Sequence, residues 1–342
     1  MPRLHVHVAE DVRRQREAAG GAPSDAETAR VGRSQAVREF VDAVWPAIDP
    51  AVLVFELLSD PARLAAAARG LLDPEEQELL GWATPPRSAK SARWSAPDAV
   101  LVDEITGLVA RPESYGHVVL DEAQDLSAMQ CRGVARRCPL GSVTVLGDLA
   151  QGTTPWSTED WHVTLAHLGK SAARIEPLTR GYRVPADVIA FANRLLPHLA
   201  VGLEPATSVR AAAGGLHVLA AEDVAAAAAV EAVRALAEEG SIGVIAADAD
   251  VPAIAAALDT LAAAHVVLGA DDEDRDEDTA RITVVPATLA KGLEFDHVVV
   301  AEPATIAAAE PRGLRRLYVV LTRAVSRLVV VHGRPLPAEL AA

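Results

Sequence analysis

Short runs of β-branched and other apolar residues alternate with helical stretches from about residue 117 onward. The runs are HVVL (117–120), VTVL (143–146), LHVL (216–219), IGVIA (242–246), ITVV (282–285), HVVVA (297–301) and LVVVH (328–332). Apolar residues are continuous within each run, which is typical of parallel strands that are covered on both faces. Helices between such strands imply right-handed crossovers, so this part of the chain predicts an α/β fold with a doubly wound parallel sheet.

The preceding part of the chain has a different pattern, and residues 25–110 are predicted to be mainly helical. In AETARVGRSQAVREFVDAVWPAI (26–48) the apolar positions recur near helical spacing. A further helix is predicted to begin at Asp73-Pro74, because Asp is a common N-cap residue and Pro fits the first turn. The acidic run DDEDRDED (271–278) predicts a solvated loop, with a docking tail as the alternative.

Composition narrows the classes of protein that the chain can belong to. With 342 residues, half of them hydrophobic, it has room for roughly two globular domains. No apolar run approaches the ~20 residues that cross a bilayer, and residues 1–20 lack a signal-peptide core, so we expect a cytoplasmic protein with no membrane contact. A net charge of −15 argues against a surface that coats nucleic acid, although a local basic groove or a basic protein partner remains possible. Cys131 and Cys138 are most simply packing residues in a helix, with a disulfide or a metal site as the alternative.

Polar residues follow two of the predicted strands at the edge where α/β sheets bind ligands. Asp121 and Glu122 come directly after HVVL, and Asp148 and Gln151 follow VTVL. Adjacent acids suit nucleotide hydrolysis, in which one carboxylate holds Mg²⁺ and the next activates water as a general base. Gln151 can contact both a γ-phosphate and the attacking water. Helix caps, solvated turns and a glutamine that bonds its own loop would give the same pattern.

Five ordered segments between residues 117 and 331 carry a resemblance to a known family. DEAQD (121–125) and GDLAQ (147–151) resemble motifs II and III of superfamily 1 helicases of the UvrD/Rep type. Residues 178–193, 282–300 and 315–331 are similar to motifs IV, V and VI of these enzymes. The resemblance implies two RecA-like parallel-sheet lobes, the first of them incomplete here, with ATP and Mg²⁺ between them.

The resemblance also implies roles for individual residues. The first lobe contributes Asp121 as the Mg²⁺ ligand, Glu122 as the general base and Gln151 as the sensor of the nucleotide state. The second lobe contributes Arg183 and Arg323, whose guanidinium groups reach the γ-phosphate, together with Tyr182, Gly292 and Glu294. Tyr182 offers an aromatic face to adenine, Gly292 permits close backbone approach, and Glu294 accepts from a ribose hydroxyl. A surface ion pair is the alternative for each arginine. Trp156 is a candidate for stacking on a nucleic-acid base.

The finer similarity is to the HelD-type, helicase-IV-like branch, whose members bind RNA polymerase and use ATP to release it from nucleic acid. It rests on YGHVVLDEAQDLSAMQ, on RRCPLGSVTVLGDLAQGTTPW and on ELLSDPARL. We therefore expect a mainly helical segment or insertion at 1–110, the remainder of the first lobe at 111–175, and the second lobe at 176–342.

The phosphate-binding loop of the family, G-x-x-x-x-G-K-[ST], does not occur in the chain. Lys170 lies in GKS but has Thr164 at the first glycine position, and the remaining lysines, Lys90 and Lys291, also lack the pattern. We expect the C-terminal part of a longer motor, with weak ATP binding and little hydrolysis unless the missing half acts in trans. Two alternatives stay open: a non-hydrolysing module that docks on RNA polymerase or on a P-loop-bearing partner, and an ordinary DNA helicase.

Overall fold

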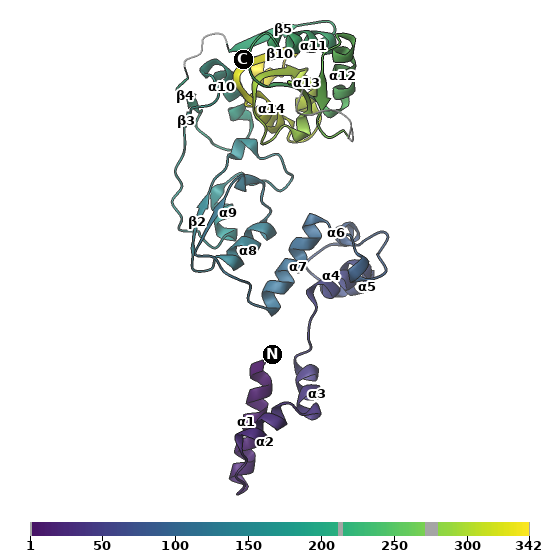
Figure 1. Cartoon of the computed structure of the whole chain (residues 1–342), viewed down its shortest axis with the longest axis vertical. Coiled ribbons are helices and arrows are strands. Elements are labelled where there is room, and N and C mark those ends of the chain that lie inside the picture. Colours follow the sequence, from purple (N-terminus) through teal and green to yellow (C-terminus); the bar gives the residue numbers. More distant parts are fainter. Residues whose placement is uncertain (1, 211–214, 271–279, 342) are drawn as a thin grey trace. The chain divides into compact units, whose positions relative to one another are not determined.

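The computed structural model describes residues 2–210, 215–270 and 280–341, so the acidic run at 271–278 lies outside the described residues. The chain forms two compact units, Met1–Pro112 and Glu113–Ala342, called here the N-terminal and the C-terminal unit (Figure 1). Within the described residues, no helix combines the length and the apolar character that crossing a lipid bilayer requires.

The N-terminal unit is helical, as the sequence predicts. Its helices are α1 (Pro2–Ala18), α2 (Asp25–Gly32), α3 (Gln35–Val44), α4 (Pro50–Ser59), α5 (Pro61–Ala67), α6 (Pro74–Leu80) and α7 (Ala96–Val109). The stretch with helical spacing forms two helices, because Ser34 accepts a hydrogen bond from the Val37 amide and begins α3. Asp73 caps α6 as predicted, in a capping box with Glu76.

The C-terminal unit is an α/β structure with parallel strands. Its helices are α8 (Ala128–Arg137), α9 (Trp161–His167), α10 (Ala186–Ala192), α11 (Val224–Ala235), α12 (Val251–Thr260), α13 (Pro303–Ala308), α14 (Gly313–Leu321) and α15 (Ala338–Ala341). Its strands are β1 (His117–Leu120), β2 (Ser142–Val145), β3 (Arg180–Gly181), β4 (Thr207–Ser208), β5 (Leu216–Ala220), β6 (Ile242–Ala246), β7 (His265–Val267), β8 (Ile282–Pro286), β9 (Phe295–Ala301) and β10 (Ala324–His332). All seven predicted strands are present. The short strands β3, β4 and β7 were not predicted, since two or three residues carry too little pattern.

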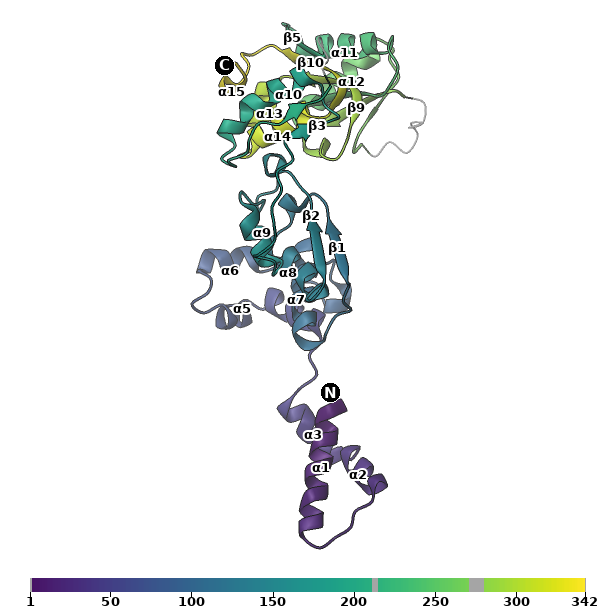
Figure 2. The same cartoon turned by 90° about the vertical axis from the view of Figure 1, so that its left-hand side faces the viewer.

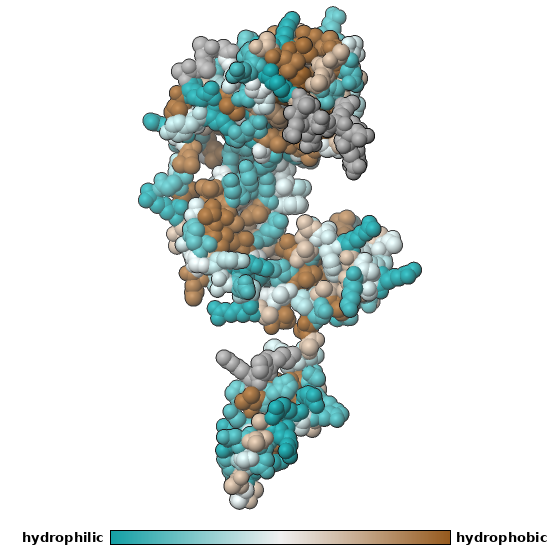
Figure 3. Space-filling view, in the orientation of Figure 1, coloured by the Kyte–Doolittle hydropathy of each residue, from teal (hydrophilic) through white to brown (hydrophobic). Residues whose placement is uncertain are grey.

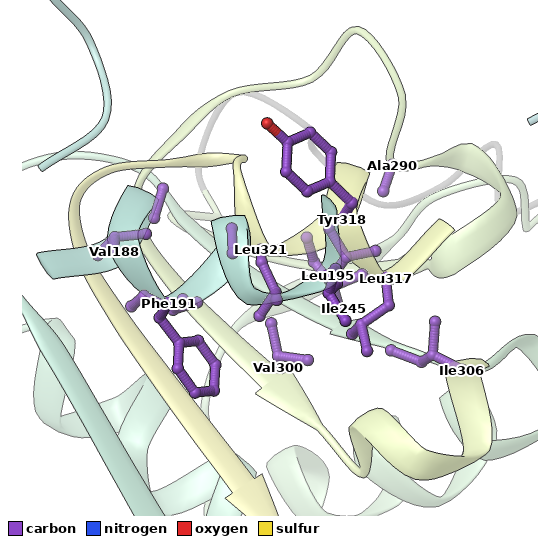
Figure 4. Packing of buried hydrophobic residues seen from close by; sticks show 14 of the residues in the cluster. Val188, Phe191, Leu195, Ile245, Ala290, Val300, Ile306, Leu317, Tyr318 and Leu321 are labelled. Carbon is purple, nitrogen blue, oxygen red and sulfur yellow. The ribbon is translucent and has the colours of Figure 1, made fainter. Parts of the chain in front are cut away.

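A six-stranded parallel sheet with the order β5-β10-β9-β6-β8-β7 forms the centre of this unit. Alternate residues of each strand point to opposite faces, so each face has its own core. On one face α11 and α12 cover Val244, Val299 and Val329. On the other face α10, α13 and α14 cover Ile245 and Val300 (Figure 4). The central strands are therefore buried on both sides, which explains their continuous apolar runs.

Strands β1 and β2 form a separate two-stranded parallel sheet, with His117 opposite Ser142 and Leu120 opposite Val145. Figure 2 shows the two strands side by side. The prediction that these strands are covered on both faces is wrong, because Val119 is 60% exposed and Leu146, just after β2, is 44% exposed. Figure 3 shows hydrophobic residues gathered on the surface where β2 and α9 lie. No further element among the described residues pairs with this sheet.

Candidate functional site

The loop after β1 carries the predicted acids and has an unusual backbone. Glu122 adopts a left-handed conformation with φ of 51°, which is uncommon for a residue other than glycine, and such strained positions cluster at functional sites. Its amide donates to the Asp121 carboxylate at 2.8 Å. The chain then enters a short 3-10 turn, Ala123–Asp125. This backbone presents Asp121 and Glu122 as exposed side chains at the carboxyl edge of the small sheet.

Gln124 ties this loop to the loop after β2. The Gln124 side chain is fully buried. Its Nε2 donates to the Glu122 carboxylate at 2.6 Å, and its Oε1 accepts from the Asp148 amide at 3.0 Å. Only glycine fits at position 147, since a Cβ there would lie 2.2 Å from Gln124 Oε1. The acids and the Gln151 segment are thus fixed relative to each other by a buried amide.

Gln151 lies in the next 3-10 turn, Leu149–Gln151, and makes two kinds of contact. Its Nε2 donates to the Asp148 carboxylate at 2.8 Å, which is a bond within its own loop. Its Oε1 accepts from Arg323 Nη2 at 2.9 Å. The second contact joins the loop after β2 to the residue that precedes β10 of the large sheet.

Arg323 and Arg183 lie near each other although both carry positive charge. Arg323 is 3% exposed, and burial, followed by the charge of Arg183, lowers the pKa of its guanidinium. Arg183 forms an ion pair with Glu294. The Arg183 Nε is buried and has no hydrogen-bond partner among the described groups. Two arginines, one with an unused donor, form an environment in which a bound anion would be stabilised.

Lys291 adds a third cation that the sequence analysis did not assign to the site. Its Nζ forms an ion pair with Asp125, lies 3.3 Å from a Glu122 carboxylate oxygen and donates to the Gln151 carbonyl at 2.8 Å. Burial alone would raise the pKa of Asp125, but hydrogen bonds from Lys291 and Ser157 outweigh it and hold that pKa below its ordinary value. The signal was available, because Lys291 is one of three lysines and Asp125 closes the DEAQD motif.

Tyr318 is a further missed residue beside this region. Burial, and then the charge of Asp148, raises the pKa of its hydroxyl. Figure 4 shows the hydroxyl directed away from the aliphatic side chains of the core. Its position in the apolar stripe of α14 predicts only a core residue, and nothing in the sequence indicates its proximity to the charge of Asp148.

The structure brings some of the predicted site residues together and leaves others at the margin. Contacts or direct charge interactions link five of them, which we call the polar cluster: Glu122, Gln151, Arg183, Glu294 and Arg323. Glu294 is paired with Arg183, so the acceptor predicted for a ribose hydroxyl is already engaged. Asp121 adjoins the cluster through Glu122.

The remaining candidates have positions of their own. Tyr182 precedes Arg183 and is 74% exposed, so its ring is accessible. Gly292 has φ of 79°, a conformation that favours glycine. Trp156 is 51% exposed, and its indole N–H donates to the Asp125 carbonyl at 2.8 Å. One edge of the indole is therefore held while part of the ring stays accessible for stacking.

The carboxylates of the site fit one mode of metal binding. Among the described residues, no group of three or more His, Cys, Asp or Glu side chains is arranged to hold a metal ion. Mg²⁺ is usually held by one or two carboxylates together with water and substrate phosphates. The exposed Asp121 fits that mode, as a single ligand of an ion that arrives with a nucleotide.

Comparison with known proteins gives one family match and distant structural likenesses. The C-terminal domain of a possible DNA helicase from Lactobacillus plantarum WCFS1 is 22% identical with a TM-score of 0.36, over 47% of this chain and 92% of that one. Arterivirus nonstructural protein 10, a helicase in complex with DNA, is 18% identical with a TM-score of 0.35, over 65% of this chain and 40% of that one. Likeness at this level carries no functional argument, and none of the curated proteins matches. Residues 282–331, which include β8, β9, α14 and most of β10, match the UvrD-like helicase C-terminal domain.

Proposed function

We propose that the polar cluster binds the terminal phosphates of ATP and that the chain is part of a UvrD/HelD-like, ATP-dependent motor. The observation that carries the proposal is the contact between Arg323 and Gln151 at 2.9 Å, beside Arg183, whose Nε is a buried donor without a partner among the described groups. Bringing two guanidinium groups together costs free energy, and a bound anion offsets this cost. The match of residues 282–331 to a helicase domain supports a nucleotide as that anion.

Each side chain has a role that follows from its place. Arg183 and Arg323 neutralise negative charge on the terminal phosphate, and Gln151 orients the attacking water. Glu122 accepts a proton from that water once its bond from Gln124 is exchanged for one from the water. Mg²⁺, bound with the nucleotide and held by Asp121, would further neutralise the phosphates. In this proposal Tyr182 stacks on the base, Gly292 permits close approach of the backbone, and Glu294 exchanges Arg183 for a ribose hydroxyl.

In its finer form, the proposal places the ATP between two RecA-like lobes, the first represented by β1 and β2 and the second by the six-stranded sheet. The substrate in this form is RNA polymerase bound to nucleic acid, because the sequence of residues 115–156 resembles that of HelD-type proteins. A DNA helicase is the less favoured form, because a net charge of −15 and an aromatic content of 4% are unusual for a protein that grips a strand by charge and stacking.

A second candidate function is a non-hydrolysing module that docks on RNA polymerase or on a P-loop-bearing partner. One observation favours it: the sequence contains no G-x-x-x-x-G-K-[ST], whose backbone amides and lysine bind most of a triphosphate. Lys291 also already neutralises Glu122 and Asp125 from within the chain. Both functions use the polar cluster, but only the motor hydrolyses ATP.

ATP hydrolysis by purified 1–342, with and without added RNA polymerase, separates these functions. Turnover that appears only with the polymerase, and that Glu122→Gln abolishes, supports the motor. Turnover of the isolated chain that Glu122→Gln abolishes refutes the expectation of an impaired chain. No turnover in either condition favours the docking module, which a pull-down of the polymerase then tests directly.

Phosphate binding itself is tested with pyrophosphate and ATP as ligands that shift the thermal unfolding midpoint. Any ligand that binds only the folded state raises this midpoint. Arg183→Gln should abolish the shift. Arg180→Gln is the matched control, because Arg180 lies three residues away on the exposed β3 and outside the polar cluster. Equal shifts in both variants would contradict the proposed site.

A further inference from the structure

We propose that Arg315 and Lys291 are positioning residues, which hold the segment 149–159 by its carbonyl groups and thereby place the Gln151 side chain against Arg323. The meaning of this placement for nucleotide binding rests on the proposed function. The placement itself is a separate statement about the fold of the C-terminal unit.

Arg315 is a buried cation that the proposed phosphate site does not use. It is 5% exposed, and burial lowers the pKa of its guanidinium. Its Nη1 donates to the Leu149 carbonyl at 2.9 Å, and its Nη2 donates to the Glu159 carboxylate at 2.8 Å. Nη2 also donates to the Leu199 carbonyl at 2.9 Å. A buried guanidinium is costly unless its donors are satisfied, so these bonds determine where the bound segment can lie.

Lys291 anchors the same segment from a different element. It lies between β8 and β9, and its Nζ donates to the Gln151 carbonyl at 2.8 Å. Arg312, at the start of α14, adds longer bonds to the Gly152 carbonyl at 3.3 Å and the Ser157 carbonyl at 3.2 Å. Three cationic side chains from residues 291–315 thus converge on one short stretch of backbone.

The segment needs such anchors because it has little regular structure of its own. Between β2 and α9 it contains only the 3-10 turn Leu149–Gln151. Arg315 holds the first residue of this turn and Lys291 holds the last, so the turn is fixed at both ends. Arg315 lies in α14, and Arg323 follows the C-terminus of α14 and donates from Nε to the Val319 carbonyl at 3.0 Å. The anchor of the turn and the partner of Gln151 are therefore both held by the same helix.

The first test measures hydrogen exchange of amides in peptides that cover residues 149–158, in the full chain without nucleotide. Bonds to charged groups are worth enough that losing them should speed exchange by about tenfold. We expect this increase in Arg315→Met and a smaller one in Arg315→Lys, which keeps the charge but not the fork. Arg316→Met is the matched control, because Arg316 lies on the same helix but pairs with Glu310. Unchanged exchange in Arg315→Met overturns the proposal.

Should Arg315→Met fail to fold, Lys291→Met takes its place, since Lys291 lies at a loop position and is 16% exposed. Lys291→Met also removes the ion pair with Asp125, so some increase in β9 and β10 is expected, and the segment should accelerate beyond it. Exchange that rises no more in the segment than in β9 and β10 would show general destabilisation alone and would overturn a specific positioning role.

The second test separates positioning from mere stability by comparing ATP with ADP. If Gln151 contacts the terminal phosphate, Arg315→Met should lower the preference for ATP over ADP by the same factor as Gln151→Ala. The double variant should lower it no further, because both changes remove one contact. Additive losses would overturn the positioning of Gln151. If the unchanged chain binds neither nucleotide, the proposed function fails, and the exchange measurement still decides the positioning role.

Discussion

Asp125→Asn offers a quantitative test of how the loop after β1 is held. The Asp125 carboxylate accepts from Lys291 on one oxygen and from Ser157 Oγ at 2.8 Å on the other. Its side chain is 20% exposed and that of Lys291 is 16% exposed, so solvent screens the pair only partly. The asparagine keeps an oxygen for Ser157 but turns an amide donor toward the lysine ammonium.

The expected loss follows from these contacts. A hydrogen bond between charged groups contributes about 1.5–3 kcal/mol, and a cation left without its partner in a mostly buried place adds to the loss. The Glu122 carboxylate, at 3.3 Å from the ammonium, offsets part of it. We expect Asp125→Asn to lower the free energy of unfolding of the C-terminal unit by about 2–3 kcal/mol, which corresponds to roughly 5–10 °C in the unfolding midpoint.

The assay is hydrogen exchange of the slowest amides in β9 and β10, which reports global opening of this unit. Asp121→Asn is the control, because Asp121 is exposed and its bond to the Glu122 amide survives in asparagine. A loss below about 0.5 kcal/mol, the usual effect of a surface change, would refute the reasoning. So would an equal loss in the two variants.

The pH dependence of this loss has a definite sign. Asp125 has its folded-state pKa below the ordinary value of about 3.9, so its carboxylate stabilises the fold above that pH and stops doing so as pH falls through the folded pKa. The difference between the unchanged chain and Asp125→Asn should be full at neutral pH and shrink as pH falls below about 4. A difference that grows on acidification would contradict the assignment of the charge to Asp125.

Three further measurements test other parts of the C-terminal unit. Gly147→Ala should cost about 1–3 kcal/mol of stability, because its Cβ would overlap Gln124 Oε1 and lie 2.7 Å from Trp161; Gly116→Ala, with nothing within 4 Å, should be nearly neutral in the same urea titration. Both cysteines are buried, and burial raises the pKa of Cys131, so neither thiol should react quickly with a disulfide reagent until urea unfolds the chain. Burial raises the pKa of the Tyr318 hydroxyl, so it should stay protonated during an alkaline absorbance titration until the chain unfolds. Tyr318→Phe is the check, because it should leave the titration of the folded chain unaltered.

The sequence predicts the strands of the large sheet well because their pattern has one cause. Runs such as IGVIA and HVVVA are apolar throughout since helices cover both faces, and β6 has the predicted bounds, Ile242–Ala246. The same rule fails for HVVL, because apolarity shows what a strand prefers and not what lies beside it. Val119 is exposed despite an equally apolar run.

The site is predictable in its residue types but not in its connections. The sequence motifs indicate Gln151 and Arg323 as site residues. Their contact, however, depends on how the small sheet packs against the residues around α14. Lys291 fits no phosphate-binding loop, yet its long side chain reaches Asp125, 166 residues earlier in the chain. Such pairings depend on how far a side chain extends in three dimensions, and neither periodicity nor motif spacing contains this information.

The small sheet of β1 and β2 has a consequence for how the chain acquires its structure. A two-stranded sheet is at best marginally stable by itself, and here its loops are tied down by residues that come more than a hundred positions later, Lys291 and Arg315. During synthesis, the stretch around 113–175 would thus leave the ribosome before its supports exist and would stay exposed to proteases and chaperones until the last strands arrive. Assembly of this unit should therefore proceed from its carboxyl-terminal sheet backward, opposite to the order in which the chain is made.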